Sequence, residues 1–193
     1  MPHLCGVGVN DAWYVVDKLI DGKRVMCPYY SKWSSMIMRC YNKKSLMRRP
    51  TYVDVVVCED WLIFSNFRKW MVSQDWVGCD LDKDVLYPNN KTYSPKTCCF
   101  IEPNLNLLLT NNKNKNTPLP TGVHLHKPNG KYIVQIGVGA SRVRLGQYNT
   151  VDEARTIYVK AKIENIKSYY GEVDKRVKKG LKRHVKLLKK EIQ

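Results

Sequence analysis

The sequence predicts an α+β protein in which a strand–turn–strand–helix unit precedes a three-stranded antiparallel sheet with its own helix. Three observations predict this class. Apolar residues recur at helical spacing in the first half, short alternating runs bounded by turn residues follow, and a polar low-complexity segment separates two regions. The expected division is residues 1–110, a linker over 111–120, a sheet module over 121–170 and a basic helical tail over 171–193.

A hairpin and two amphipathic helical regions are expected before residue 80. Asp21 and Gly22 lie between two short runs that suit strands, which favours a hairpin about a tight turn. Pro28 suits the first turn of a helix. Aromatic and apolar residues then recur at helical spacing and are expected to form a core. They are Trp33, Met36, Ile37 and Cys40 and, further on, Trp61, Phe64, Phe67 and Trp70.

The strand–turn–strand–helix unit begins at Leu81 and is the first candidate for chemistry. Residues 81–84 open it, residues 89–91 form a turn, residues 93–101 return as a strand, and residues 103–109 can form a short helix. This order of elements is the layout of a ββα-metal nuclease site.

Three short strands and a helix are expected after the polar segment. The strands are residues 122–126, 131–138 and 141–148, and turn residues separate them. Thr150 and Glu153 have the spacing of a capping box at the start of the helix. Its apolar stripe is Ala154, Ile157, Tyr158 and Ala161. The expected arrangement is an antiparallel sheet with the helix laid across one face.

The other face of this sheet is expected to be polar. The residues assigned to the helix side are Val123, Leu125, Ile133, Val143 and Leu145. Strand alternation then places His124, His126, Arg142 and Arg144 on the opposite side, with part of residues 131–135. These side chains can donate hydrogen bonds to guanine edges and phosphates in a major groove. The alternative is a solvated basic face.

The overall charge indicates a polyanionic partner. Lys and Arg total 33 against 17 acidic residues, a net charge of +16 over 193 residues. Nucleic acid and anionic membrane both fit that charge. No apolar run approaches the roughly 20 residues that cross a bilayer, and the N-terminus lacks the features of a signal peptide. The expected location is therefore the cytoplasm, with no membrane partner.

Seven cysteines in such a location are expected to be thiols or metal ligands. Cys27, Cys40, Cys58 and Cys98 come from four separate segments without a Cys-x-x-Cys pair. Two interpretations stay open for them, a structural zinc site and buried free thiols.

The C-terminal tail combines charge with an apolar stripe. Residues 174–193 carry nine Lys or Arg against two acids. The stripe consists of Val177, Leu181, Val185, Leu188 and Ile192. Such a helix can bind nucleic acid, a membrane surface or a partner helix, and we expect phosphate contacts. A basic solvated tail is the alternative.

The sheet module resembles a known DNA-binding family. Gly-Val-His-Leu-His, Gly-Lys-Tyr, Arg-Val-Arg-Leu-Gly-Gln-Tyr and Thr-Val-Asp-Glu-Ala, within residues 121–163, resemble the ethylene-response-factor (Apetala-type) domain. The resemblance implies that the outer sheet face reads the major groove of double-stranded DNA. The positions that match the family's contacts are His124, His126, Lys131, Gln135, Arg142 and Arg144. Arginines are usual where His124, His126 and Gly137 stand, and a tryptophan where Arg144 stands, so base preference does not carry over.

Residues 27–110 resemble phage-borne HNH-type proteins. The matching motifs are Trp33-x-x-Met36-x-x-x-Cys40-Tyr41-Asn42, Val57-Cys58-Glu59-Asp60-Trp61, Phe64-Ser65-Asn66-Phe67, Leu81-Asp82-Lys83-Asp84 and Tyr93-Ser94-Pro95-Lys96-Thr97-Cys98. The resemblance implies Mg²⁺ or another divalent metal at Asp82 and a final ligand near Asn106. Asn90 would position the loop or the phosphate. Lys83 stands where the general-base histidine is usual, and can bind phosphate or act as a base.

Together the resemblances imply a sequence-directed DNA-binding protein of a phage or mobile element. The first expectation is an HNH-like, homing-type endonuclease that hydrolyses phosphodiester bonds, acting in a host cytoplasm. The alternative is a catalytically inactive HNH-fold regulator or host-takeover protein. A third class, an interaction protein for protein or RNA, uses the same basic surfaces.

Overall fold

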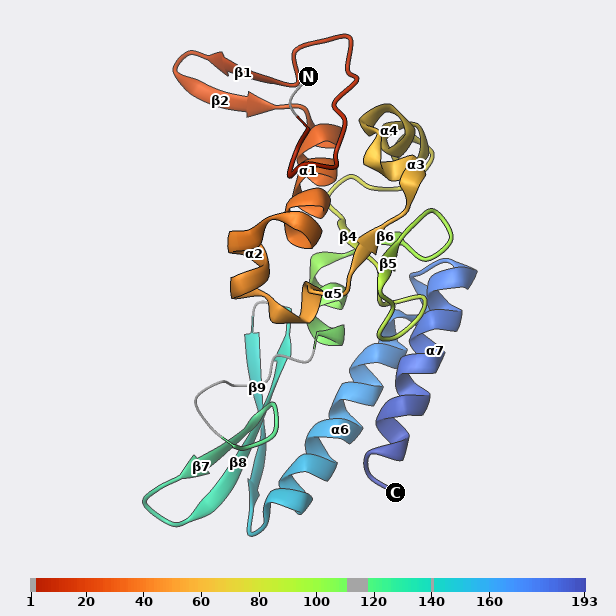
Figure 1. Ribbon diagram of the computed structural model, residues 1–193. Coiled ribbons are helices and arrows are strands. Elements are labelled where there is room, and N and C mark those ends of the chain that lie inside the picture. Colours follow the sequence, from red (N-terminus) through yellow and green to blue (C-terminus); the bar gives the residue numbers. More distant parts are fainter. Residues whose placement is uncertain (1–2, 111–117, 140) are drawn as a thin grey trace. The chain divides into compact units, whose positions relative to one another are not determined.

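The computed structural model describes residues 3–110, 118–139 and 141–193, and its fold is α+β (Figure 1). The chain divides into two compact units, Met1–Phe100 and Ile101–Gln193. The division therefore falls ahead of the linker expected over residues 111–120, and the short helix before that linker belongs to the second unit. Residues 111–117 of the expected linker lie outside the described residues.

The first unit consists of short helices and two-stranded pairings. Its elements are β1 (Asp17–Ile20), β2 (Lys23–Met26), α1 (Pro28–Tyr41), α2 (Lys43–Arg48), η1 (Pro50–Tyr52), β3 (Val56–Val57), α3 (Glu59–Leu62), α4 (Phe64–Val72), β4 (Asp80–Asp82), β5 (Thr92–Tyr93) and β6 (Cys99–Ile101), whose last residue opens the second unit. β1 and β2 pair antiparallel about Asp21 and Gly22, which both have positive φ. The expected hairpin is confirmed.

The core of the first unit is aromatic. Trp33, Trp61 and Phe67 are at most 1% exposed, so both helical stripes of the sequence are confirmed as core. The indole N–H of Trp33 donates to the carbonyl of Trp61 at 2.7 Å. The second helical stretch is broken at Ile63, whose backbone is extended and forms a parallel bridge to Val9. The break follows from that pairing, because a strand-like residue cannot continue a helix.

The return strand expected over residues 93–101 is two strands. β5 pairs parallel with β3, and β6 pairs with β4. A turn at Ser94–Thr97 separates them, in which the Cys98 N–H donates to the Ser94 carbonyl at 2.9 Å. The single hairpin of a ββα layout is thus interrupted at this turn.

The second unit contains one three-stranded sheet and three helices among its described residues. Its elements are α5 (Pro103–Leu109), β7 (Val123–His126), β8 (Lys131–Val138), β9 (Ser141–Tyr148), α6 (Val151–Ser168), the short η2 (Tyr169–Gly171) and α7 (Lys175–Lys190). β8 lies between β7 and β9 and pairs antiparallel with both. The expected sheet and the helix that follows it are confirmed.

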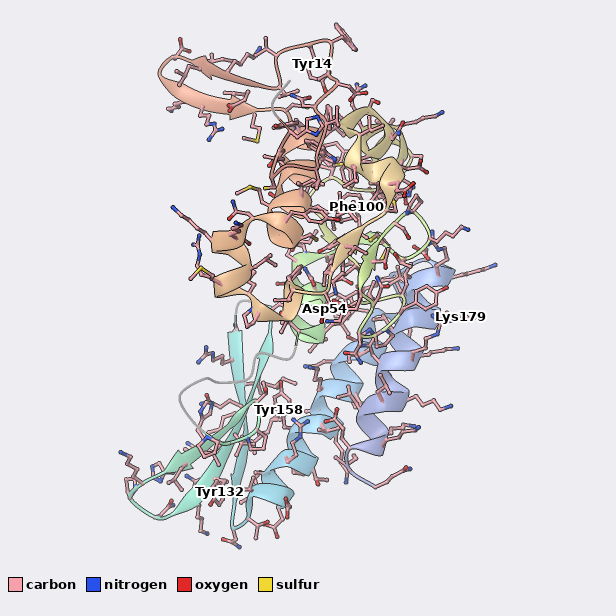
Figure 2. All side chains as sticks on the ribbon, viewed as in Figure 1. Tyr14, Asp54, Phe100, Tyr132, Tyr158 and Lys179 are labelled. Atoms are coloured by element: carbon pink, nitrogen blue, oxygen red, sulfur yellow. The ribbon has the colours of Figure 1, made fainter. Side chains whose placement is uncertain are left out.

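α6 begins as its sequence predicts, and of its expected apolar stripe Ala154 and Tyr158 are buried whereas Ile157 and Ala161 are half-buried. The Glu153 N–H donates to the Thr150 hydroxyl at 3.2 Å, and the Glu153 carboxylate accepts from the Thr150 N–H, which completes the capping box. Tyr158 lies between α6 and the sheet (Figure 2). Gly122 has a φ of +78°, and a Cβ there would lie 2.2 Å from the Tyr158 ring. Only glycine permits this close contact between sheet and helix.

α7 packs against α6 through its apolar stripe. The Asp174 carboxylate caps its first turn, accepting from the N–H groups of Arg176 and Val177. Arg155 near the start of α6 pairs with Glu191 just after α7, so the two helices run antiparallel. The buried residues of the stripe are Val177, Leu181, Val185 and Leu188. Within the described ranges, none of the helices has the length and hydrophobicity required to span a bilayer.

Candidate nucleic-acid interface

Strand register determines which residues of the sheet point away from α6. Val123 pairs with Val134, and both are at most 2% exposed, so this pair faces the helix. The adjacent pairs must point the other way, because side chains alternate along a strand. His124 therefore shares the outer face with Ile133, its cross-strand partner. Ile133 was expected on the helix side, and the pairing corrects that assignment.

A β-bulge determines the orientation of the two arginines on β9. Val134 pairs with Gly146 but Gln135 pairs with Arg144, so Leu145 is an extra residue in β9. If Leu145 took a regular position opposite Gln135, Arg144 would lie opposite the buried Ile136 and point toward α6. Because Leu145 is bulged out of the ladder, Arg144 pairs with Gln135 and lies on the outer face. Gly146 has a φ of +134°, a conformation that favours glycine.

The outer face gathers all six residues that the sequence selected. Arg142 pairs with Gly137 and Arg144 with Gln135, while His126 pairs with Lys131. We call this set the reading face; its members are His124, His126, Lys131, Gln135, Arg142 and Arg144. The sequence has no Asp or Glu between Thr121 and Thr150, so the face carries uncompensated positive charge.

The six residues of the reading face differ in the hydrogen bonds that their side chains already form within the protein. The His126 ring lies 2.8 Å from the Asn129 side-chain oxygen, and that oxygen also accepts from the Lys131 N–H at 3.1 Å. His126 therefore helps to order the β7–β8 turn. Arg142 and Arg144 are exposed, and neither guanidinium has a hydrogen bond or ion pair with another described residue. These two are the most available donors of the reading face.

A groove of about 300 Å³ adjoins the reading face within the second unit. α5 contributes Asn104, Leu107 and Leu108 to its wall, and the sheet contributes His124 and Arg142. Sequence reasoning missed this groove, because nothing local in residues 103–109 indicates that this helix packs beside the sheet.

In the first unit, Asp82 lies at the end of β4 and caps the turn that follows. One carboxylate oxygen accepts from the N–H groups of Asp84 at 2.7 Å and Val85 at 2.6 Å. Burial raises the pKa of the Asp82 carboxyl, although both backbone donors act in the opposite direction. The hydrogen bonds give this residue a structural role whether or not it binds a metal.

Lys83 is held by neighbours in the first unit. Its side chain is nearly buried, and the ammonium donates to the Asp84 carboxylate and to the Asn90 carbonyl, both at 2.7 Å. The ring of Tyr52 lies 5.6 Å from the same nitrogen. An ammonium held in these contacts is poorly placed to accept a proton from water, as a general base must.

Asn90 stabilises the loop in which it lies. Its amide nitrogen donates to the carbonyls of Lys83 at 2.9 Å and Thr92 at 2.6 Å, so it joins the end of β4 to the start of β5. Of its two expected roles, the structure supplies the contacts for loop positioning. Asn106 lies on α5 in the second unit, so within the first unit only Asp82, Lys83 and Asn90 come together.

None of the four cysteines considered as zinc ligands forms a disulfide. Cys27 precedes α1 and Cys40 lies in its last turn, so about 20 Å of helix separates them. Across the ranges that the structure covers, no three His, Cys, Asp or Glu side chains form a group that could hold a metal. Burial raises the pKa of Cys40 and of Cys98 to about 12, so both thiols stay protonated at neutral pH. The buried-thiol interpretation fits these two.

In comparisons with known proteins, no family model matches the chain, and no curated protein or solved structure matches it either.

Proposed function

We propose that this protein is a sequence-directed double-stranded DNA-binding protein whose reading face enters the major groove. One observation carries the proposal. The β9 bulge directs Arg142 and Arg144 to the same side as His124 and Gln135, on a sheet without acidic residues. Exposed guanidinium groups on a sheet face suit guanine edges and phosphates.

The spacing of the donors supports base reading. Arg142 and Arg144 are two residues apart on one strand, so their Cα atoms lie about 7 Å apart. Successive base pairs rise about 3.4 Å, so the two side chains match positions about two base pairs apart. Gln135 lies directly opposite Arg144, where its amide can contact adenine.

The test is a selection of bound duplexes from a random pool, followed by affinity measurements on the selected site. Replacing Arg142 and Arg144 with Ala is expected to cost about 1–3 kcal/mol for each base-reading arginine at that site, and much less on random DNA. The matched control replaces Lys18 and Lys23, two exposed lysines of the first unit, with Ala. An unchanged motif in the double arginine variant would refute a reading role for this sheet.

A second candidate function is metal-dependent DNA cleavage by the first unit. It is favoured by the position of Asp82 at the end of β4, beside a loop that Asn90 fixes, with β6 paired to β4. The donor set fits Mg²⁺ incompletely. One Asp82 oxygen already accepts two backbone hydrogen bonds, and Asp84 is paired with Lys83. The contacts of Lys83 favour the alternative, an HNH-like unit that does not cut.

Plasmid nicking with Mg²⁺, with and without a chelator, separates these two alternatives. If the unit cuts, Asp82→Ala is expected to abolish nicking and to leave DNA affinity nearly intact, because a metal-bound carboxylate acts on the chemical step. Wild-type protein that binds DNA but never nicks, across several divalent metals, would identify a DNA-binding regulator.

A further inference from the structure

α7 carries a large positive charge that no acidic residue within the helix neutralises. Its 16 residues include nine Lys or Arg and no acidic residue. Like charges three or four positions apart destabilise a helix, and cations in the first turn oppose the helix dipole. The helix nevertheless forms, because its apolar side is buried in the second unit. Positive charge that destabilises the helix in the absence of a ligand would be neutralised by a polyanionic ligand.

The packing of α7 excludes one role that its sequence allowed. A helix that lies on a membrane inserts its apolar face among the lipids. In α7 that face is already buried, with Val177 and Leu181 at most 2% exposed and Val185 and Leu188 at 7%. The side that remains accessible is cationic.

Five lysines form one line along the accessible side of α7. We call them the lysine stripe: Lys175, Lys179, Lys182, Lys186 and Lys189. Their spacing of four, three, four and three residues keeps them on one face of a helix with 3.6 residues per turn, opposite the buried residues. All five side chains are exposed, and none of their ammonium groups has a hydrogen bond or ion pair with another residue in the described ranges. Figure 2 labels Lys179 on this helix.

The stripe fits the backbone of a DNA duplex. It extends over 14 residue steps, or about 21 Å at 1.5 Å per residue. That length corresponds to about six base pairs of duplex, and flexible ammonium groups contact phosphates without reading bases. Within the second unit, α6 lies between the sheet and α7 (Figure 1), so the stripe is not part of the reading face.

We propose that the lysine stripe is a second DNA surface, which holds the phosphate backbone of a duplex segment other than the one in contact with the reading face. The proposal rests on the proposed function in that duplex DNA is the ligand. It adds that sequence-independent affinity comes largely from α7, whereas sequence preference comes from the sheet.

The test compares two triple variants with equal loss of charge. One replaces Lys179, Lys182 and Lys186 with Gln, which removes the charge, keeps an unbranched polar side chain and suits a helix. The control replaces Lys18, Lys23 and Lys69, three exposed lysines of the first unit, with Gln. Affinity for a random duplex is measured across salt concentration for both variants and for the wild type. Circular dichroism checks that each variant is folded.

The stripe variant is expected to have a slope of log K against log salt that is less steep by about 2.7, from about 0.9 per lost phosphate contact. The control should keep nearly the wild-type slope. The stripe variant should also still select the wild-type DNA motif, whereas the double arginine variant of the sheet should lose the motif and keep most of the slope. Equal slope losses in both lysine variants, or no loss in the stripe variant, would overturn the proposal. The selection tests the proposed function separately.

Two further measurements test whether duplex DNA is the ligand of the lysine stripe and whether the stripe binds a duplex segment of its own. With short duplexes, saturation is expected at two per wild-type chain and one per stripe-variant chain; one per wild-type chain would refute separate segments. Vesicles containing phosphatidylserine and a single-stranded RNA serve as competing polyanions. A stripe-dependent preference for either of them over duplex DNA would overturn the assignment to DNA.

Discussion

Among the described residues, each unit buries one lysine, and the two lysines have different environments. Lys83 in the first unit is 7% exposed and pairs with Asp84 and the Asn90 carbonyl. Lys162 on α6 in the second unit is 2% exposed, and burial, together with the nearby Arg155 charge, lowers its pKa to about 8. Lys83, which lies at a motif position, is thus held by structural contacts. Lys162, whose pKa is lowered by burial and by a nearby charge, lies outside every motif. A motif residue indicates chemistry only where its side chain remains available.

The units also differ in where they place polar groups. In the first unit, the residues selected for chemistry bond to one another or cap turns, and the core around them is aromatic. In the second unit, Asn106 lies on α5, whereas the residues selected for contacts with DNA lie on an exposed sheet face and on α7. This contrast is the reason that the proposed function depends on the second unit. All five tryptophans lie before residue 80, so tryptophan fluorescence follows the first unit selectively.

The largest expected effect tests the aromatic core. Trp33→Ala should destabilise the first unit by about 4 kcal/mol, because a fully buried indole is lost and the Trp61 carbonyl loses its donor. Urea titration followed by tryptophan fluorescence measures the change. Trp13→Ala is the control, since Trp13 is 90% exposed and should change stability by less than about 0.5 kcal/mol. Similar losses in both variants would contradict the assignment of the core.

The next effect tests the buried lysine of the second unit. At pH 7 the Lys162 ammonium is charged in the folded state, and its lowered pKa corresponds to about 3 kcal/mol of destabilisation. Between its folded pKa of about 8 and its unfolded pKa of about 10.5, the unfolded state binds more protons, so this group makes stability rise with pH. Lys162→Met should therefore stabilise the second unit at pH 7 by about this amount, and by much less at pH 10.

The control for this prediction is Lys160→Met on the same helix, where the side chain is exposed. It should leave the pH profile of wild-type unfolding unchanged. Unfolding is followed by circular dichroism, and the part of the transition that does not coincide with tryptophan fluorescence reports the second unit. A Lys162→Met variant that is no more stable at pH 7 than at pH 10 would show that burial does not strain this lysine.

The first unit is expected to have the opposite pH dependence. The buried Cys40 and Cys98 thiols have pKa values of about 12, against about 9 in the unfolded chain. Above pH 9 the unfolded state releases these protons first, so stability falls as pH rises toward 12. Each thiol should remove about 1.4 kcal/mol by pH 10. Cys98→Val should reduce the loss seen by tryptophan fluorescence; an identical alkaline profile would contradict the prediction.

The smallest effect concerns the start of α6. Thr150→Ala removes one half of the capping box and should cost about 1 kcal/mol in the second unit. Thr150→Ser retains the hydroxyl and should cost less. The measurement is urea unfolding followed by circular dichroism, with tryptophan fluorescence expected to stay unchanged. A fluorescence transition that shifts equally would mean that the two units unfold together.

Local signals in the sequence predicted much of this fold. The Asp21–Gly22 hairpin, the capping box of α6 and the alternating strands of the second unit each depend on residues close together in the chain. The same alternation placed Arg142 and Arg144 on the outer face. It failed at Ile133, because the face of β8 depends on its register with β7, in which Ile133 pairs with His124.

Features that depend on distant partners could not be predicted. Ile63 interrupts a helix because Val9 pairs with it, and the return strand divides because β5 pairs with β3. The contacts of Lys83 with Asn90 are likewise a property of the folded loop. The motif at residues 81–84 therefore did not reveal how its lysine is held.

The extra residue at Leu145 makes the basic face of the sheet tolerant of one genetic change. Deleting that one codon would remove the bulge and leave a regular ladder, in which Arg144 still pairs with Gln135 and Arg142 with Gly137. The protein would lose a single leucine, and both arginines would stay on the outer face. A lineage could thus gain or lose the bulge in one in-frame event without moving any charged residue to the other face.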